Sequence, residues 1–368
     1  MEIRAVTSRA DRKAFIRFPW SIYAWDRNWV PPLLLDQETL LDTAKNPFFQ
    51  HAEMEMYLAW SEGVPIGRIA AILDRSHNEF HGERTLHFGF FECVDDVAVA
   101  RALLDRAKEM GRARGMTTIR GPVNPSTNET CGMLIEGFDS PPVIMMTYNP
   151  RYYLSLMERA GLAKAKDLYA WYCDHDIVKL DQLRRVTARV KERHKVTFRS
   201  LDLSRFDEEV GLVHGIYNRA WERNWGFVPM TEAEFRHMGK NLKPVIVPEL
   251  AFVAESDGKP AGFILGLPDL NLAIRHANGR LFPFGLLKIL WHARKIRTCR
   301  VITLGVVPEL RKRGIEGLLI FELIERAPRY PGGELSWILE DNRQMNGILE
   351  TMGARLYKRY RIYEAPIA

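Results

Sequence analysis

Apolar and polar residues follow a strand-like pattern in two long stretches of the chain that resemble one another. The first stretch, YLAWSEGVPIGRIAAILD, covers residues 57–74, and the second, FVAESDGKPAGFILGLPD, covers residues 252–269. Each contains two apolar runs joined by Glu-Gly or Asp-Gly, which is a strong local signal for a β-hairpin. We therefore predict one hairpin in each half of the sequence.

The two halves of the chain are related by a nearly constant offset. The hairpin stretches begin at residues 57 and 252, which are 195 residues apart (252 − 57). A second pair of segments, AWDRNW at 24–29 and AWERNW at 220–225, is offset by 196 residues (220 − 24). Two matches at nearly the same offset indicate that the halves are copies of one unit.

The predicted elements also follow the same order in both halves. In the first half the central strand is expected at 85–93 and the next helix at 97–114. Strands mixed with helices in this way predict an α/β (α+β) fold, with two tandem units that each form a mixed twisted sheet with helices on both faces. For the second half we predict strands at 196–201, 299–307 and 334–340, helices at 208–223, 231–240, 317–325 and 343–352, and a closing hairpin through 356–365.

The length of 368 residues agrees with two domains of ordinary size. We place the first domain at residues 1–178 and the second at 196–368. The basic segment between them, residues 179–195, has apolar residues at helical spacing and is predicted to be a linker helix.

A basic turn lies between a predicted strand and a predicted helix of the second half. Its sequence is RKRGIEG, residues 311–317. The first N–H groups of a helix are unpaired and lie at its positive end, so a turn of this kind is suited to phosphate. The turn also contains Glu316, whose carboxylate would repel phosphate. We expect Glu316 to point away, toward Arg313 or solvent, while its amide still serves the ligand.

The second half, from residue 196 onward, resembles the Gcn5-related N-acetyltransferase (GNAT) superfamily. The loop pattern of that family is Arg/Gln-x-x-Gly-x-Gly/Ala after a central strand. Arg311, Gly314 and Glu316 stand at its three places, and Glu316 departs from the pattern.

Further positions agree with this resemblance. The family has an Asn followed by a helix that ends in Glu and Gly, and Asn342, Glu350 and Gly353 match these positions. The first half matches through the repeat and through LMERAGL at 156–162, which is similar to ILETMGA at 348–354. The chain is thus identified as similar to tandem GNAT proteins.

The resemblance implies acetyl-CoA or another acyl-CoA as co-substrate and no metal. Loop amides, the helix dipole and the basic side chains would receive the pyrophosphate. The strand before the loop is expected to splay from its neighbour and to offer backbone groups to the pantetheine arm. Gly314 would let the backbone approach the cofactor closely. The implied cofactor-binding residues are Val306, Val307, Arg311, Lys312, Arg313, Gly314, Ile315, Gly317 and Asn342.

The first half is expected to have lost the cofactor site. Asp95 and Asp96 fall near the position of the basic turn, where carboxylates would repel a pyrophosphate. The same residues are favourable at the start of the following helix. We therefore expect one coenzyme A site per chain and a degenerate first domain.

Candidates for acid and base catalysis follow from the same resemblance. The family's frequent acid, a tyrosine one residue before the matched Glu350, is replaced by Leu349. Tyr360 is our first candidate to replace it, ahead of Tyr357 and Tyr363, although each of the three also fits a half-buried strand aromatic.

Glu340 and Asp341 close a predicted strand and are the candidate bases, acting on an ammonium through water. In the alternative interpretation Asp341 caps the next helix and Glu340 is solvated.

Two segments suggest contacts with the acceptor or with a surface. The polar loop at 121–132, GPVNPSTNETCG, offers Asn124, Ser126 and Asn128 to a polar acceptor, unless it is an ordinary surface loop. The stretch from Leu281 to Arg297 is apolar and then basic. It fits a helix that buries its apolar face, or a lip that accepts an acyl chain or rests on an anionic membrane.

Composition narrows the choice of function only slightly. A net charge of +6 favours anionic partners. The four cysteines are scattered and predict neither a metal site nor a disulfide framework. The charged N-terminus predicts no signal peptide, hence a cytoplasmic protein.

The function that the sequence favours is an acyl-CoA-dependent N-acyltransferase, most simply an acetyltransferase, acting on a small-molecule or peptide amine. The alternatives are a tandem GNAT protein that transfers aminoacyl groups from tRNA and a non-catalytic acyl-CoA binder. In the class that uses tRNA the coenzyme A loop is generally degraded, whereas here it departs from the pattern at only one position. Nucleic acid is therefore an unlikely partner.

Overall fold

Both predicted hairpins are present in the computed structural model, which describes residues 1–178 and 180–367. In each hairpin turn the two central residues have positive φ, with 50° and 79° at Glu62 and Gly63 and 49° and 74° at Asp257 and Gly258. Two consecutive positive φ values define the tight turn that matches the twist of paired strands. The hairpin strands are β2 (Ala52–Ser61) with β3 (Val64–Asp74), and β11 (Ala251–Ser256) with β12 (Lys259–Pro268).

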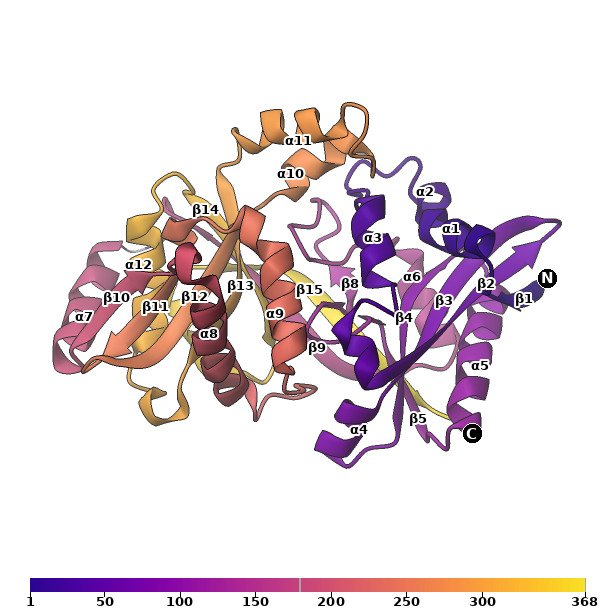
Figure 1. The fold of residues 1–368 in the computed structure, drawn as a ribbon, viewed down its shortest axis with the longest axis horizontal. Helices are drawn as coiled ribbons and strands as arrows, with labels where there is room; N and C mark the ends of the chain where they lie inside the picture. The colour runs from indigo at the N-terminus through magenta and orange to yellow at the C-terminus, as the bar shows by residue number, and fades with distance from the viewer. Residues whose placement is uncertain (179, 368) are drawn as a thin grey trace. The chain divides into compact units, whose positions relative to one another are not determined.

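The chain divides into two compact units, drawn in Figure 1. The division does not coincide with the two halves of the sequence, because segments 274–286 and 358–368 belong with the first unit. Lys179 and Ala368, which the predicted linker and second domain include, lie outside the described residues. The first unit contains Met1–Asp167, Ile274–Leu286 and Lys358–Ala368, and the second contains Leu168–Ala273 and Leu287–Tyr357.

The sheet of the first unit has the order β1-β2-β3-β4-β5-β15. Only β4 and β5 are parallel neighbours, so the sheet is mixed. The predicted closing hairpin is wrong, because β15 is one long strand. Its sequence, RLYKRYRIYEAP, contains no Gly, Asn or Asp to form a turn. The strands not yet defined are β1 (Glu2–Ala5), β4 (Thr85–Cys93), β5 (Thr118–Gly121) and β15 (Arg355–Pro366), with β8 (Met133–Glu136) also pairing with β15.

The sheet of the second unit repeats this order as β10-β11-β12-β13-β14-β9. Again one neighbouring pair, β13 and β14, is parallel. Each sheet is completed by a strand from the other half of the sequence, β15 in the first unit and residues 168–174 of β9 in the second. The strands are β9 (Ala163–Asp174), β10 (Val196–Ser200), β13 (Thr298–Val306) and β14 (Gly332–Leu339).

Helices cover both faces of the second unit's sheet (Figure 1). Side chains on a strand alternate between the two faces. Phe252 and Ile264 accordingly pack with α7, α12 and α13, whereas Val253 and Phe263 pack with α8 and α9. The predicted fold class and the predicted helix between the halves are confirmed. The helices are α7 (Leu180–Arg193), α8 (Phe206–Trp221), α9 (Glu232–Leu242), α12 (Ile315–Arg326) and α13 (Arg343–Met352).

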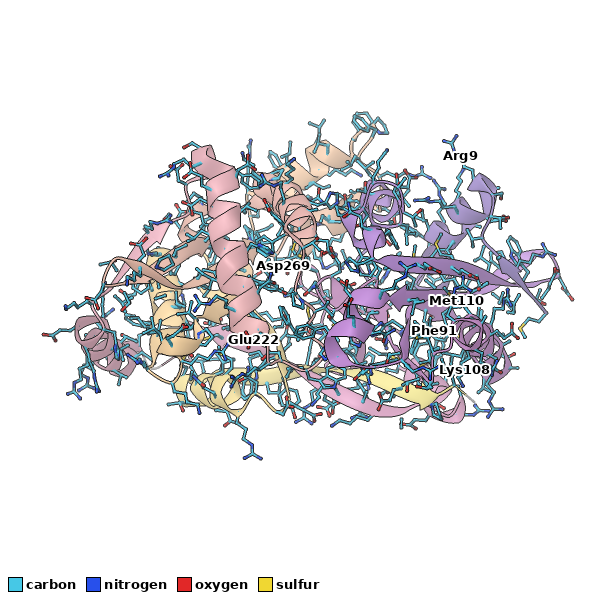
Figure 2. All side chains as sticks on the ribbon, turned by 60° about the horizontal axis from the view of Figure 1, so that its bottom comes forward. Arg9, Phe91, Lys108, Met110, Glu222 and Asp269 are labelled. Atoms are coloured by element: carbon cyan, nitrogen blue, oxygen red, sulfur yellow. The ribbon has the colours of Figure 1, made fainter. Side chains whose placement is uncertain are left out.

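The first unit has a core between its sheet and two helices, α5 (Val97–Ala113) and α6 (Tyr152–Arg159). Phe91 and Met110, labelled in Figure 2, belong to this core. Asp96 accepts a hydrogen bond from the amide of Ala98 at 2.8 Å, so the prediction that this aspartate starts the helix is confirmed. The remaining helices of this unit are α1 (Arg9–Arg17), α2 (Pro19–Ile22), α3 (Leu34–Leu40) and α4 (Arg75–His81).

Several short elements connect these parts. They are β6 (Val123–Asn124), β7 (Thr130–Cys131), α10 (Asn271–Ile274), α11 (Gly285–Ala293), and the 3₁₀ helices η1 (Pro47–Gln50), η2 (Leu203–Arg205), η3 (Lys243–Val245), η4 (Pro248–Leu250), η5 (Arg275–Ala277) and η6 (Pro308–Leu310).

Candidate active site

The parallel strands β13 and β14 separate partway along their length. Their pairing runs from Thr298 opposite Gly332 to Val301 opposite Leu335 and ends there among the described residues. Both strands continue, to Val306 and Leu339. The predicted splay of the central strand is therefore confirmed, and it leaves backbone groups on the facing edges available to an extended ligand.

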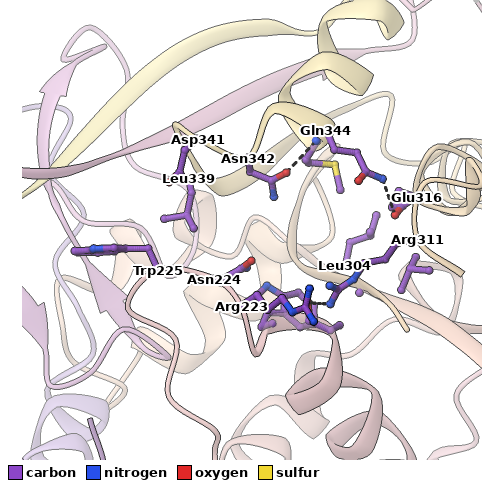
Figure 3. A pocket seen from close by; sticks show the side chains of 15 residues that line it. Arg223, Asn224, Trp225, Leu304, Arg311, Glu316, Leu339, Asp341, Asn342 and Gln344 are labelled. Atoms are coloured by element: carbon purple, nitrogen blue, oxygen red, sulfur yellow. Dashed lines mark hydrogen bonds between the residues drawn. The ribbon is translucent and has the colours of Figure 1, made fainter. Parts of the chain in front are cut away.

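A cavity of about 330 Å³ lies where the strands have separated (Figure 3). Its wall is built by four segments of the second unit. They are the end of α8 with the loop after it (Ala220, Trp221, Arg223, Asn224, Trp225), the end of β13 (Leu304, Gly305, Val306), the basic loop and α12 (Arg311, Glu316), and the end of β14 with α13 (Leu339, Asp341, Asn342, Gln344, Met345).

The glycine of the basic loop is explained by the turn itself. Gly314 is the residue before α12 and has φ +84°, in the left-handed region that favours glycine. An added Cβ would meet Val190 Cγ2 of α7 at 3.1 Å. Backbone conformation and packing against α7 are thus sufficient reasons for this glycine, and its close approach to a cofactor stays a prediction.

Arg311 fastens the loop to the end of α8. Its Nη2 donates to the carbonyl oxygens of Ala220 at 2.7 Å and Arg219 at 3.1 Å. Carbonyls at a helix C-terminus lack helical partners and attract cations. Arg311 also lines the cavity, so it combines this anchoring contact with a position beside the ligand space.

The other predicted cofactor residues are distributed differently. Val306 and Asn342 line the cavity, whereas Lys312 and Arg313 are exposed on the loop and do not line it. Ile315 lies in the core of the second unit. The amide of Val307 donates to the carbonyl of Ala261 at 2.9 Å. A Cβ added at Gly317 would meet Ile348 Cγ2 at 3.9 Å, which is an ordinary van der Waals contact.

Glu316 points into the cavity, so the expectation that it faces Arg313 or solvent is wrong. Only 6% of the residue is exposed. Its Oε1 accepts a hydrogen bond from Nε2 of Gln344 at 2.9 Å, and its buried Oε2 has no hydrogen-bond partner among the described residues (Figure 3). Side chains in a helix lean toward its N-terminus, which directs a carboxylate in the first turn back over the loop amides.

The surroundings of Glu316 favour its protonated form. Burial is the largest influence and raises the pKa of this carboxyl above its usual value. Backbone N–H groups of Glu316 and Lys312, the amide of Gln344 and the charge of Arg311 act in the opposite direction. A neutral carboxyl would tolerate a phosphate nearby, whereas the ionised form would repel it.

Asn342 caps α13 with its side chain. Its Oδ1 accepts a hydrogen bond from the amide of Met345 at 3.1 Å, which leaves the Nδ2 donor for the cavity. The alternative in which Asp341 forms this cap is therefore wrong. Asp341 is exposed and lines the cavity, while Glu340 does not line it.

Tyr360 and Leu349 are both buried. Tyr360 is fully buried, belongs to the first unit and does not line the cavity. A role of Tyr360 as a proton donor stays a prediction. Leu349, at the position of the family's usual tyrosine, is fully buried in the core of the second unit.

The repeated AWERNW segment supplies five cavity residues, Ala220, Trp221, Arg223, Asn224 and Trp225. In the sequence this repeat indicated duplication, and a polar residue between aromatic ones after an amphipathic helix was also a signal for a binding site. In the first unit the same motif packs internally. Asn28 donates to the carbonyl of Phe138 at 2.9 Å, and the Trp29 ring stacks on Tyr23 with centroids 4.9 Å apart.

In the first unit a loop fills the edge of the corresponding strand. Pairing of β4 with β5 ends at His87 opposite Arg120. Beyond it, the carbonyl oxygen of Val123 would lie 1.7 Å from a Cβ added to Gly89, and Asn124 Oδ1 accepts from the amide of Phe90 at 2.6 Å. The edge that a pantetheine arm would need is thus occupied by the chain itself.

The predicted acceptor contacts belong to this loop. Besides its bond to β4, Asn124 donates from Nδ2 to the hydroxyl of Thr130 at 3.2 Å. Ser126 accepts from the amide of Asn128 at 3.2 Å. These bonds hold the loop, and a role of Asn124, Ser126 and Asn128 toward an acceptor stays a prediction.

Among the described residues, no group of three or more His, Cys, Asp and Glu residues is placed to hold a metal ion. No helix in this part of the chain is both long and apolar enough to cross a membrane. All four cysteines are buried, as expected for small apolar side chains.

Comparison with known proteins gives one family and two full-length relatives. Residues 212–354 match the Acetyltransferase (GNAT) family. The chain is 40% identical to Protein YghO of Escherichia coli (strain K12), with 99% of this chain and 95% of that protein covered. It is 38% identical to Bacterial ceramide synthase of Caulobacter vibrioides (strain NA1000 / CB15N), with 99% and 97% covered.

Solved structures with low sequence identity share the fold over the whole chain. A tandem GNAT protein from the clavulanic acid biosynthesis pathway has a TM-score of 0.60 at 13% identity and covers 100% of this chain and 98% of its own. A GCN5-related N-acetyltransferase from Sphaerobacter thermophilus has a TM-score of 0.53 at 15% identity, with 100% and 95% covered.

Proposed function

Because the chain belongs to the GNAT superfamily and is built as a tandem GNAT protein, we propose that it transfers the acyl group of an acyl-CoA to the amine of a long-chain amino alcohol. The acceptor class rests on the relative named Bacterial ceramide synthase, because a ceramide is the amide of a fatty acid and such an amine. The reaction is an acyltransfer other than aminoacyl transfer, and a cytoplasmic location stays a prediction.

The observation that carries the proposal is the cavity between the separated ends of β13 and β14. It extends from the free strand edges to the N-terminus of α12. An extended amide-containing arm suits the strand edges, because their N–H and C=O groups need partners. Phosphate suits the start of the helix. Coenzyme A has both parts in this order, and Glu316, at the start of the helix, does not fit its phosphates when ionised.

The chemistry requires little covalent participation by the protein. The neutral amine attacks the thioester carbonyl, so that the C–N bond forms, the C–S bond breaks and coenzyme A leaves as its thiolate. Asp341, exposed at the cavity wall, is placed to take the ammonium proton through water. The thiol of cysteine has a pKa of about 8.5, so a thiolate of this kind is a tolerable leaving group. Through water it takes up the second proton, which the nitrogen loses as the amide forms. The lack of a tyrosine at position 349 is compatible with this route.

One observation favours a second candidate, a protein that binds acyl-CoA without turning it over. Leu349 is part of the core, and no tyrosine is found among the described residues that line the cavity. A binder would need neither a base nor an acid. Turnover distinguishes it from the enzyme.

The proposed function is tested by thiol release. Acetyl-CoA and acyl-CoA donors of increasing chain length would be combined with sphinganine, with short amines and with peptide amines. We expect thiol release with a long-chain amine and a fatty acyl-CoA, reduced by Asp341→Asn in kcat more than in KM. If no combination of donor and amine releases thiol although CoA still binds, the enzyme proposal would be rejected in favour of the acyl-CoA binder.

A further inference from the structure

The segment from Arg280 to Arg297 exposes an unusual number of large apolar side chains. It contains six of the thirteen large hydrophobic residues that are exposed among the described residues. Phe282 is 79% exposed and Trp291 61% exposed. The other seven are scattered through the rest of the chain. The six are Phe282, Phe284, Leu286, Leu287, Leu290 and Trp291.

The helix of this segment, α11, is apolar on two faces. Ile289 and Ala293, one turn apart, pack against the core of the second unit. Leu287, Leu290 and Trp291 follow the spacing i, i+3, i+4 and therefore form a stripe on a different face. A helix that is apolar on all sides is normally buried. The inner face of α11 is buried and its outer face is exposed. The outer stripe therefore resembles a surface that a binding partner covers.

The charges of the segment itself have a single sign. No Asp or Glu lies between Asp269 and Glu309 in the sequence. Lys295 places its ammonium 5.6 Å from the ring centroid of Trp291. The exposed cations of the segment are Arg280, Lys288, Arg294, Lys295 and Arg297.

From this arrangement we infer that the part of the segment that belongs to the second unit, residues 287–297, docks the protein on an anionic phospholipid bilayer. Leucine and aromatic side chains enter the boundary between headgroups and acyl chains, and the flanking cations contact the phosphates. Tryptophan prefers this boundary, and lysine can keep its charge in water while its stem lies on apolar surface. No helix in the described residues crosses a membrane, so the contact is peripheral.

Two other occupants fit the segment less well. A symmetric contact with a second copy would bring the same patch of both chains together and would place like charges opposite each other. A nucleic acid would match the cations but would leave the Leu287 and Leu290 side chains without an apolar partner. An anionic bilayer matches both properties. The inference does not depend on the identity of the reaction, although it places the enzyme where a long-chain amine is dissolved.

The test is flotation of the full-length protein with vesicles. One set contains phosphatidylglycerol mixed with phosphatidylethanolamine, and the other contains phosphatidylcholine alone. Leu287→Gln with Trp291→Gln removes apolar contact, and Arg294→Glu with Arg297→Glu reverses charge. Trp25→Gln is the apolar control, because Trp25 is 95% exposed outside the segment. Arg9→Glu with Lys13→Glu, also exposed, is the charge control.

We expect binding to the anionic vesicles, weakened by salt, and weaker or no binding to phosphatidylcholine. Each variant of the segment should lower the partition coefficient about tenfold or more, and each control should leave it within a factor of two or three. All exchanged side chains are exposed, and a thermal melt of each variant checks folding. Failure of the wild type to float, or equal flotation of all variants, would overturn the inference. So would a dimer in light scattering that the segment variants dissociate while flotation is absent.

Discussion

Nε2 of Gln344 donates a hydrogen bond to Oε1 of Glu316 at 2.9 Å across the cavity wall. The contact joins the start of α12 to α13 and holds a buried carboxylate at the place expected for a pyrophosphate. The second carboxylate oxygen of Glu316 has no hydrogen-bond partner among the described residues. We therefore propose that Glu316 influences how the loop binds its ligand.

Glu316→Gln should tighten the binding of CoA about tenfold near neutral pH, or about 1.4 kcal/mol. The exchange keeps the shape of the side chain and removes a charge that repels phosphate in a partly dry site. Isothermal titration calorimetry measures the change. Asp341→Asn is the control, because it removes an equal but exposed charge from the same cavity and should have a smaller effect. Unchanged or weaker binding by Glu316→Gln would contradict this role.

The raised pKa of Glu316 predicts a pH dependence of binding. Bound phosphate favours the protonated carboxyl, so CoA should bind most tightly below the folded-state pKa and progressively less tightly as pH rises through it. Wild-type binding should also take up protons, measurable as a dependence of the binding enthalpy on the buffer. Both effects should disappear in Glu316→Gln. A pH dependence that the variant retains would assign it to another group.

Gly305→Ala should destabilise the second unit by about 1–3 kcal/mol, because a new Cβ overfills the space beside Trp221. The added atom would lie 2.5 Å from the Trp221 ring. Gly317→Ala is the matched control, because its Cβ has room and alanine favours a helix by up to about 1 kcal/mol. Denaturant unfolding should show opposite signs for the two exchanges. Equal stability of both variants would show that Trp221 moves without a penalty.

Asn124→Ala separates a structural role from a binding role. The exchange removes the acceptor of the Phe90 amide and should lower stability by about 1–3 kcal/mol. If the side chain only holds its loop, KM for the amine should stay the same. A higher KM with unchanged stability would instead support the predicted contact of Asn124 with the acceptor.

Two buried histidines of the first unit predict a loss of stability in acid. Burial lowers the pKa of His77 and lowers that of His87 well below its usual value, and the rings lie 4.5 Å apart near His81 and Arg120. The unfolded chain then binds more protons than the folded one below about pH 6.5. The contribution to stability is thus present above that pH and is lost as pH falls. The free energy of unfolding, plotted against pH over this range, should have a smaller slope for His87→Gln than for the wild type. An equal slope would exclude His87 as a source of the pH dependence.

Local patterns in the sequence predicted most of the fold correctly. The Glu-Gly and Asp-Gly turns, the period of apolar residues and the offset repeat gave both hairpins and the helices around them, because these signals act between neighbours in the chain. The pairing partner of a strand is a long-range property. No local signal therefore showed that β15 and β9 each complete the sheet of the other half.

The candidate site was predicted only in part, because local motifs determine some of its features and long-range packing determines the others. The loop from Arg311 to Gly317, Asn342 and the splay of β13 follow from motif and order. The inward direction of Glu316 depends on how a first-turn side chain leans in a helix, which the loop pattern does not contain. Exposure of the 280–297 segment depends on what surrounds it, and periodicity alone does not distinguish a covered apolar face from an open one.

The most direct test of the central claim is formation of an amide. Purified protein would be incubated with sphinganine and a fatty acyl-CoA whose acyl group carries an isotope label, and the lipids would be analysed by mass spectrometry. The account predicts an N-acylated product that carries the label, formed in proportion to the thiol released. Release of thiol with the label only in free fatty acid, or no labelled amide with any amine although CoA binds, would contradict it.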